Sequence, residues 1–202
     1  MWMLKRSRAY SPALALVALA FLATAAHAGW QDDASPFDAN RLTKLDEARA
    51  KGLSEAEGGQ DMATIHAVLD AAPVAASESE LTGHWRCRTI KLGGLTPDIV
   101  YSWFSCRISQ GDGGLVFEKL SGSQRLWGRL YPNEGGGYVL LGALSVKGEP
   151  PHRYSGNRAS AGAESTPDDA VGVLSATGAG RARIEFPYPV QESTFDVIEL
   201  KR

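Results

Sequence analysis

Few side chains in this sequence have the types and the spacing that catalysis requires. After position 28 the histidines are His66, His84 and His152, and none lies in an H-E-x-x-H or other paired arrangement. Ser155 follows His152 in the stretch PHRYSG, but it lacks the G-x-S-x-G elbow of a serine nucleophile. We therefore predict no catalytic residue and no cofactor, and we keep a hydrolase centred on the His152 loop as one alternative.

The acidic and glycine-rich segments do not indicate a metal or phosphate site either. Asp168 and Asp169 form a pair in a polar loop, which is more typical of a helix cap or a solvated loop tip than of metal ligands. The glycine run 135–137 joins two expected strands and precedes no helix, so it lacks the context of a phosphate-binding loop. We expect no bound metal ion.

The N-terminus has the three-part layout of a secretory signal peptide. Three basic residues lie within positions 5–8, an almost unbroken apolar run covers 12–25, and the small-x-small sequence Ala26-His27-Ala28 follows. The apolar run is shorter than the roughly 20 residues needed to span a bilayer. We expect cleavage after Ala28, a periplasmic or secreted protein, and no membrane span after cleavage.

The composition of the remaining chain, 29–202, excludes some partners. The leader removes three of the 21 Lys and Arg residues and none of the 23 Asp and Glu residues, which leaves a net charge near −5. The charges are dispersed along the chain, so there is no basic excess of the kind that binds nucleic acid or an anionic membrane surface. The length suits one domain with a small appendage.

Cys87 and Cys106 are the two cysteines of the chain, and 18 residues separate them. An even number of cysteines in an exported protein favours a disulfide. Closing a loop of this length stabilises a fold by about 3 kcal/mol. A metal pair is the weaker alternative, because no second Cys or His pair lies nearby at ligand spacing.

The cysteines also predict where their neighbours point. Facing residues of an antiparallel pair have a constant sum of numbers, so Trp85 faces Ile108 if the two cysteines face each other. Arg86 and Arg88 alternate with the first cysteine and should point away from the disulfide. They are either solvated charges on an outer wall or, if they point into a barrel lumen, an anion site.

Residues 29–80 are predicted to form a segment of two or three short helices. Ser35 followed by Pro36 and Asp38 has the pattern of a helix N-cap. The landmarks expected after this cap are a stop at Gly52, a second capping box at 54–57, a third cap at Asp61, an apolar stripe of Met62, Ile65, Leu69 and Ala72, and an end at Pro73. A short polar linker at 75–80 completes the segment.

From Leu81 the hydrophobic period changes from helical to two, which is typical of strands. Eight strands are expected within residues 81–202, namely 83–92, 99–108, 115–120, 124–131, 138–146, 170–177, 180–186 and 194–201. Their mostly short connections favour an antiparallel barrel or sandwich over a parallel sheet. We predict a mainly β fold, an eight-stranded antiparallel barrel-like domain preceded by two or three short α-helices.

Two of these strands predict different surroundings for their outer faces. The strand 138–146 is apolar on both faces, so something should cover it from outside. We expect the N-terminal helical segment to pack on this strand and on its neighbour, 171–174. In the strand 180–186 charged residues alternate with apolar ones, which predicts a wall with solvent outside.

The Gly83-x-Trp85 pattern on the first strand resembles the opening of lipocalin-type barrels and of small periplasmic barrels that inhibit secreted metalloproteases. The resemblance implies a calycin- or lipocalin-like barrel in which the tryptophan closes one end beneath a cation from a late strand. The candidates for that cation are Lys201, Arg202, Arg181 and Arg183. The helical segment argues against close similarity to the inhibitors, which lack it.

A wider set of motifs runs along the chain, namely WRCRTIKLGG with YSWFSCRI, KLSGSQRL, LYP, LGALSVKGEPPHRYSG and FPYPVQESTFDVIEL. Together these motifs resemble the bacterial family known as domain of unknown function 4893. The resemblance covers most of the chain from Ser35 onward and implies an exported protein of a Gram-negative bacterium. It implies no activity and carries over no functional residues.

The candidate ligand contacts come from aromatic positions and from the long polar loop 147–169. Loops of this length in a compact domain are often functional, and the stretch PPHRY offers a titratable ring, a guanidinium and a phenol. Three tryptophans and Tyr138 are expected to line the barrel interior or its mouth. The candidate ligand-binding residues are Trp85, Arg86, Arg88, Trp103, Trp127, Tyr138, His152, Arg153 and Tyr154.

We predict a monomeric, non-enzymatic binding module whose partner is a small ligand or an envelope protein. The alternatives are a protease inhibitor-like or envelope interaction protein, and the hydrolase. A cavity in the barrel favours the ligand-binding module, and a filled barrel with an exposed apolar patch favours the interaction protein. A hydrolase requires His152 within hydrogen-bond reach of a carboxylate and a hydroxyl.

Overall fold

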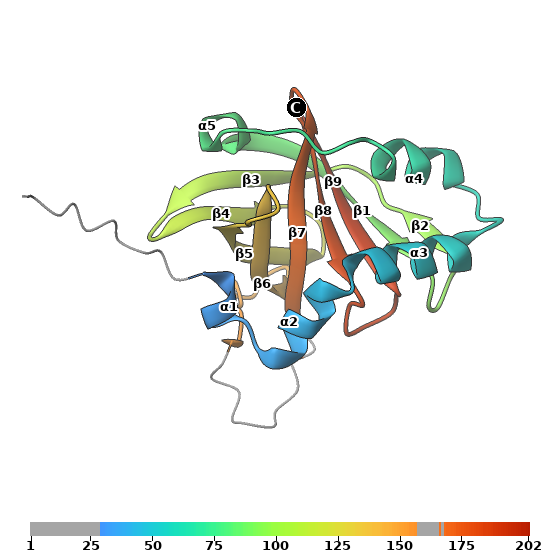
Figure 1. Cartoon of the computed structure of the whole chain (residues 1–202), viewed down its shortest axis with the longest axis horizontal. Helices are drawn as coiled ribbons and strands as arrows, with labels where there is room; N and C mark the ends of the chain where they lie inside the picture. Colours follow the sequence, from blue (N-terminus) through green and yellow to red (C-terminus); the bar gives the residue numbers. More distant parts are fainter. Residues whose placement is uncertain (1–28, 157–165, 167) are drawn as a thin grey trace, which may run out of the picture.

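The computed structural model describes residues 29–156, 166 and 168–202, so the predicted signal peptide lies outside the described residues. Within these described residues, five short helices precede nine strands (Figure 1). The helices are α1 (Trp30–Asp33), α2 (Pro36–Thr43), α3 (Leu45–Ala56), α4 (Met62–Leu69) and α5 (Glu78–Leu81). The strands are β1 (Gly83–Leu92), β2 (Asp98–Val100), β3 (Phe104–Gly111), β4 (Gly114–Lys119), β5 (Gln124–Pro132), β6 (Tyr138–Val146), β7 (Asp169–Gly178), β8 (Arg181–Pro187) and β9 (Phe195–Lys201).

Eight of the strands close into an antiparallel barrel, which confirms the predicted fold class. The order runs from β1 through β3 to β9, and β9 pairs back with β1 to close the circle. The extra strand, β2, pairs with the last residues of β1. It comes from the expected strand 99–108, which is broken between Val100 and Phe104.

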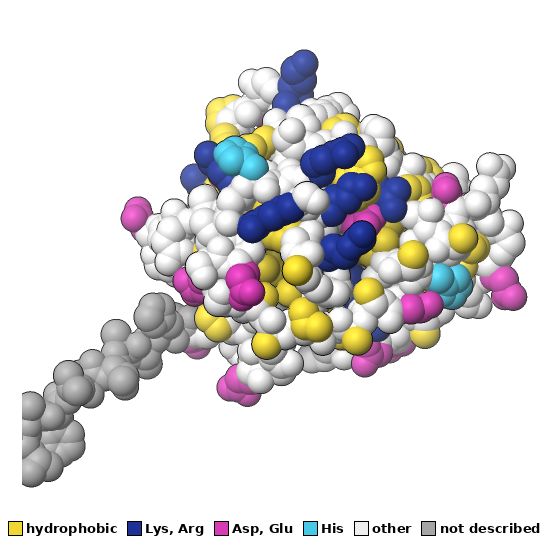
Figure 2. All heavy atoms as spheres, turned by 90° about the horizontal axis from the view of Figure 1, so that it is seen from above, with side chains coloured by type: hydrophobic (Ala, Val, Ile, Leu, Met, Phe, Trp, Pro, Cys, Tyr) yellow, Lys and Arg dark blue, Asp and Glu magenta, His cyan; other side chains and the backbone are white. Residues whose placement is uncertain are grey.

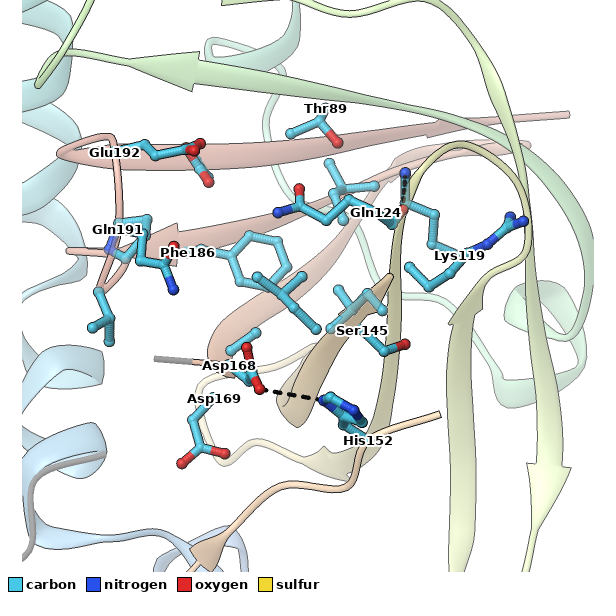
Figure 3. A pocket seen from close by; sticks show the side chains of 18 of the residues that line it. Thr89, Lys119, Gln124, Ser145, His152, Asp168, Asp169, Phe186, Gln191 and Glu192 are labelled. Carbon is cyan, nitrogen blue, oxygen red and sulfur yellow. Dashed lines mark hydrogen bonds and ion pairs between the residues drawn. The ribbon is translucent and has the colours of Figure 1, made fainter. Parts of the chain in front are cut away.

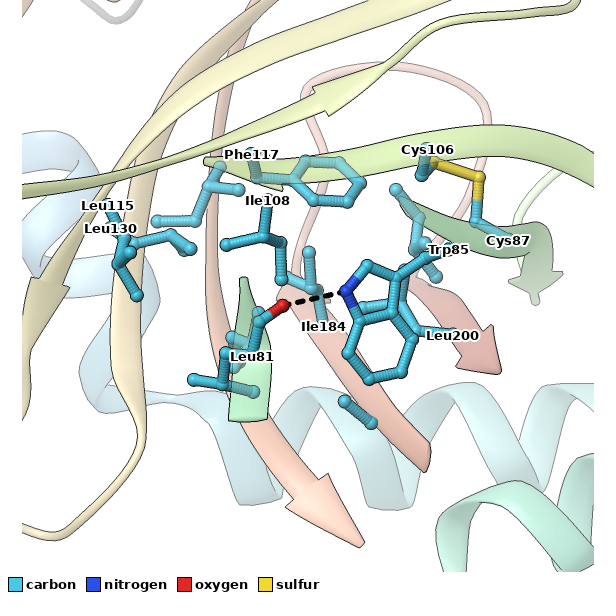
Figure 4. Close-up of a cluster of buried hydrophobic side chains, with 14 of the residues drawn as sticks. Leu81, Trp85, Cys87, Cys106, Ile108, Leu115, Phe117, Leu130, Ile184 and Leu200 are labelled. Atoms are coloured by element: carbon cyan, nitrogen blue, oxygen red, sulfur yellow. Dashed lines mark hydrogen bonds between the residues drawn. A yellow bond between two sulfur atoms is a disulfide. The ribbon is translucent and has the colours of Figure 1, made fainter. Parts of the chain in front are cut away.

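One end of the barrel is filled with apolar side chains (Figure 4). Ile108, Phe117 and Leu174 are fully buried there, and Leu81 of α5 covers the end. Trp85 lies in this cluster and donates its indole N–H to the carbonyl oxygen of Leu81 at 2.8 Å. The guanidinium of Arg202 lies 4.2 Å from the centre of the Trp85 ring, so the last residue of the chain supplies the cation at the closed end.

Cys87 and Cys106 form the predicted disulfide, with their Cα atoms 5.8 Å apart. The predicted register is wrong by two residues, because Cys106 pairs with Trp85 and Cys87 pairs with Phe104. The bridge is therefore diagonal. A shift of two residues keeps both cysteines on the inner face, and their Cα separation remains in the range that a disulfide spans.

The helices cover two separate regions of the outer barrel wall. Ala34 and Leu42, from the α1–α2 region, form one apolar cluster with Val139, Leu141 and Val171 of β6 and β7. Helices α3 and α4 form a second cluster with β1 and β9. Its fully buried members include Ala48, Ile65, Ile90, Leu92, Phe195 and Val197.

The N-cap at Ser35 is present, since its side chain accepts a hydrogen bond from the Asp38 backbone N–H. The expected stop at Gly52 is wrong, because α3 continues to Ala56 and takes in Ser54 of the expected second capping box. Gly52 instead permits a close contact: a Cβ there would lie 2.7 Å from the Cβ of Phe195. Asp61 does begin α4, but its side chain makes no capping hydrogen bond.

The charged face of β8 is exposed to solvent only at Arg181, whereas the alternation predicted solvent along the whole face. Arg183 and Glu185 are 2% and 1% exposed. Arg183 donates to the carbonyl oxygens of Val68 and Ala71 at the end of α4, and Glu185 accepts from Arg49 of α3. The helices of the second cluster therefore cover charged residues as well as apolar ones.

Candidate functional site

The end of the barrel opposite Trp85 holds a pocket of about 410 Å³ that opens to solvent (Figure 3). It lies where β1, β6 and β8 end and where β5, β7 and β9 begin. Alternation brings the inward side chains of these strand ends together. Its apolar wall is formed by Leu126, Leu144, Phe186 and Ile198, and its polar wall includes Thr89, Gln124 and Ser145.

One side of the pocket carries a linked group of charges on β1, on β9 and in the loop between β8 and β9. Lys91 donates to the carboxylate of Glu192, and Ser193 donates to Asp196 at 2.5 Å. Burial lowers the pKa of Lys91, but the Glu192 hydrogen bond and the nearby carboxylates outweigh it, so the pKa is raised. Burial raises the pKa of Asp196 to about 6, against the opposing effects of Ser193 and Lys91.

The other side carries Lys119 of β4 and Arg125 of β5. Lys119 is 8% exposed and donates to the backbone carbonyl oxygens of Gln124 and Ser121 at 2.6 and 3.3 Å. Burial, and then the charge of Arg125, lowers the pKa of Lys119 to about 8. Among the described residues, no salt bridge joins either side chain to a carboxylate.

His152 lies at the rim of the pocket between two carboxylates. Its Nδ1 is 3.3 Å from Asp168 and its Nε2 is 3.7 Å from Glu149. In the described part of the chain no hydroxyl hydrogen-bonds to this ring, and the hydroxyl of Ser155 donates to Asp169 instead. Within the described residues, the contacts of His152 thus include no hydroxyl nucleophile of the kind that a hydrolase needs.

The other sequence-predicted contacts are dispersed over the molecule. Trp85 and Tyr138 lie at the closed end of the barrel, far along their strands from the pocket. Trp127 lies on the outside, where the guanidinium of Arg153 stacks 3.4 Å from its ring centre. Tyr154 holds the helical segment, because it accepts from the Ser35 backbone N–H and donates to Asp38.

Trp103 is also on the outer wall, so the expectation that Trp103 and Trp127 line the interior is wrong. Three cations surround its ring, with Arg86, Arg88 and Lys201 at 5.3, 4.7 and 4.1 Å from the centre. Arg88 also pairs with Glu199 at 2.6 Å. Figure 2 shows a face of the molecule on which Lys and Arg side chains gather. Arg86 and Arg88 are thus outer-wall charges and not an anion site inside the barrel.

The comparison with known proteins identifies a family. Residues 30–200 match the family described as a domain of unknown function, DUF4893. The chain belongs to the DUF4893 family. Neither a curated protein nor a solved structure matches the chain. The pocket of this DUF4893 protein is therefore interpreted from its own residues.

The described residues of the DUF4893 chain show neither a metal centre nor a membrane helix. They contain no group of three or more His, Cys, Asp or Glu side chains that could hold a metal ion. No helix within them is both long and apolar enough to cross a bilayer. The pocket is lined by hydrogen-bond donors, hydrogen-bond acceptors and apolar surface.

Of the sequence-predicted ligand contacts, His152 is the one that lines this pocket, and Lys119, Gln124, Phe186 and Asp196 were missed. The alternation of the strands could have identified these four residues. Lys119 continues the inward series of Leu115 and Phe117, and the other three likewise occupy inward positions at one end of their strands. Polar residues that continue an inward apolar series at the same barrel end indicate an open mouth.

Asp196 should make the stability of the fold depend on pH. Its native pKa of about 6 exceeds the ordinary 3.8, so its ionised form opposes folding. Lowering the pH from 8 to 4.5 should stabilise the wild type by about 1–2 kcal/mol through this group, since the native state then binds more protons than the unfolded state.

The replacement Asp196→Asn should remove that contribution. The free energy of unfolding is measured with urea under non-reducing conditions for both proteins. We expect the difference, variant minus wild type, to be about 1–2 kcal/mol larger at pH 8 than at pH 4.5. An equal difference at both pH values would show that Asp196 titrates normally.

Proposed function

We propose that this chain is an exported, non-enzymatic binding protein that holds a small ligand in the open end of its barrel. The observation that carries the proposal is the asymmetry of the barrel, which is filled around Trp85 and hollow beyond Phe186. A pocket of about 410 Å³ lies within the range of small-molecule sites, and its apolar wall with a few polar groups is typical of them.

The alternative of an interaction protein has less support. A filled barrel with an exposed apolar patch would favour that alternative, whereas this barrel has a cavity at one end. The plug formed by Trp85 and Arg202 supports a likeness to lipocalin-type barrels, which the sequence pattern also suggested. The disulfide supports export, because disulfides persist in oxidising compartments. We accordingly assign 1–28 as a cleaved signal, 29–80 as a helical cover and 81–202 as the binding barrel.

Native mass spectrometry of the protein purified from the periplasm tests the proposal. We expect a fraction of the wild-type protein to carry a small additional mass that is released on denaturation. The replacement Leu144→Trp, which fills the pocket, should abolish that mass. Leu95→Trp is the matched control, because Leu95 is 81% exposed and does not line the pocket. Bound masses that are identical in wild type and Leu144→Trp would contradict the proposal.

A further inference from the structure

Lys119 occupies an unusual position for a lysine. Strand β4 sends Leu115, Phe117 and Lys119 to the interior in turn, and the first two are fully buried in the filled part of the barrel. The third position in this series reaches the pocket. The Lys119 ammonium group therefore occupies a position where the alternation of the strand predicts an apolar side chain. Burying an ammonium group costs free energy unless the charge is paired.

Among the residues that the structure describes, the partners of this ammonium group are neutral. Its Nζ donates to two backbone carbonyl oxygens and lies 4.2 Å from the centre of the Phe104 ring. Two other cations of the pocket wall differ in this respect, since Lys91 pairs with Glu192 and Arg41 pairs with Asp38. Lysine has three N–H donors, so two carbonyl oxygens leave one for a ligand.

Arg125 adds a second positive charge to the same side of the pocket. Its Nη1 is buried and has no hydrogen-bond partner among the described residues. Its charge adds to burial in lowering the pKa of Lys119 to about 8, so the two cations are close enough to repel each other. A bound anion would offset this repulsion and satisfy the vacant donors.

Resting on the proposed function, we infer that the ligand is an amphipathic monocarboxylate whose carboxylate lies against Lys119 and Arg125. A planar carboxylate matches the guanidinium and accepts from the ammonium. The apolar part of the ligand would lie along Leu144, Phe186 and Ile198. A single negative charge suits the site, because Glu192 and Asp196 on the opposite side repel a more highly charged anion.

The test compares two probes with the same apolar chain, decanoate and 1-decanol, by titration calorimetry on the full mature chain. We expect wild type to bind decanoate at least roughly tenfold more tightly than 1-decanol at pH 7, as a charge-assisted hydrogen bond predicts. This preference should shrink at pH 9.5, where unliganded Lys119 has lost its proton. Arg125 of β5, whose charge acts on Lys119, stays charged at that pH.

Variants localise the effect. Lys119→Met keeps the unbranched shape of the side chain and removes its charged end, so it should lower decanoate affinity by roughly tenfold and leave 1-decanol binding unchanged. Lys44→Met is the matched control, because Lys44 is exposed at the start of α3 and does not line the pocket. If Lys119→Met does not fold, the wild-type preference and its loss at pH 9.5 decide the question.

The outcomes separate the two proposals. Equal binding of both probes by wild type would overturn the carboxylate assignment and leave the ligand-binding barrel standing. Binding of neither probe would also overturn the assignment. The proposed function would then be tested independently by the native mass spectrometry of wild type and Leu144→Trp. A decanoate preference that Lys44→Met and Lys119→Met reduce equally would show that the anion is held elsewhere.

Discussion

A chain that begins at Leu81, and so lacks residues 29–80, is expected to lose its cooperative unfolding transition. The deletion uncovers large side chains of the outer wall that are at most 2% exposed in the complete fold. They are Ile90, Leu92, Val139, Leu141, Val171, Phe195 and Val197. Each such side chain contributes about 1.5–3 kcal/mol when buried, and a typical domain is stable by only about 5–15 kcal/mol.

Urea unfolding followed by near-ultraviolet circular dichroism checks this expectation. The truncated chain should lack the sharp transition of the mature protein and should bind a hydrophobic dye. A chain beginning at Ala34 is the control, because it loses only α1, which contains no buried residue. We expect the control to unfold nearly as wild type does. If the chain from Leu81 were as stable as the mature protein, the helices would contribute nothing to the stability of the barrel.

The strands were largely predictable because their signal is local. Alternation within β1 and β6 gave both of their ends correctly, since period two and the flanking turns are contained in the segments themselves. The end of α3 was not predictable in this way. Gly52 resembles a helix stop, but its role depends on Phe195, which is more than 140 residues away in the sequence. A contact of that kind overrides local propensity.

The two ends of the barrel also differed in how well the local sequence predicted them. The closed end was anticipated because a tryptophan pattern marks it. The open end was missed because inward Lys119 and Asp196 resemble surface residues when each is considered alone. Trp103 was misplaced for a related reason: it was assigned to a continuous strand, whereas it lies in the break between β2 and β3.

The buried charges of β8 show most clearly what the sequence pattern conceals. Arg49 reaches from α3 to one carboxylate oxygen of Glu185, at 2.6–2.8 Å, and Arg183 donates to the other at 2.8 Å. Arg183 is further held by two carbonyl oxygens at the end of α4. Through Arg49 and Arg183, the Glu185 carboxylate thus joins two helices to the barrel wall. The alternating charges of this strand had been interpreted as a face in contact with water.

Replacing Glu185 by alanine is therefore expected to cost about 3–5 kcal/mol, because it leaves the guanidinium of Arg183 buried without its counter-ion. Urea unfolding at pH 7 measures this loss. Replacing both residues of β8, as Arg183→Met with Glu185→Leu, should recover most of it, since a buried ion pair and an apolar pair of similar size are often equally stable.

The matched control for this replacement is Glu118→Ala. Glu118 pairs with Arg107 at 2.6 Å on the outer wall, where the side chains are 21% and 43% exposed. An ion pair that water can reach contributes little, so the control should lose less than about 1 kcal/mol. Similar losses for Glu118→Ala and Glu185→Ala would mean that water reaches the β8 pair too. The helices would then cover this part of the barrel loosely, and the expected collapse of the chain from Leu81 would have to rest on the apolar contacts alone.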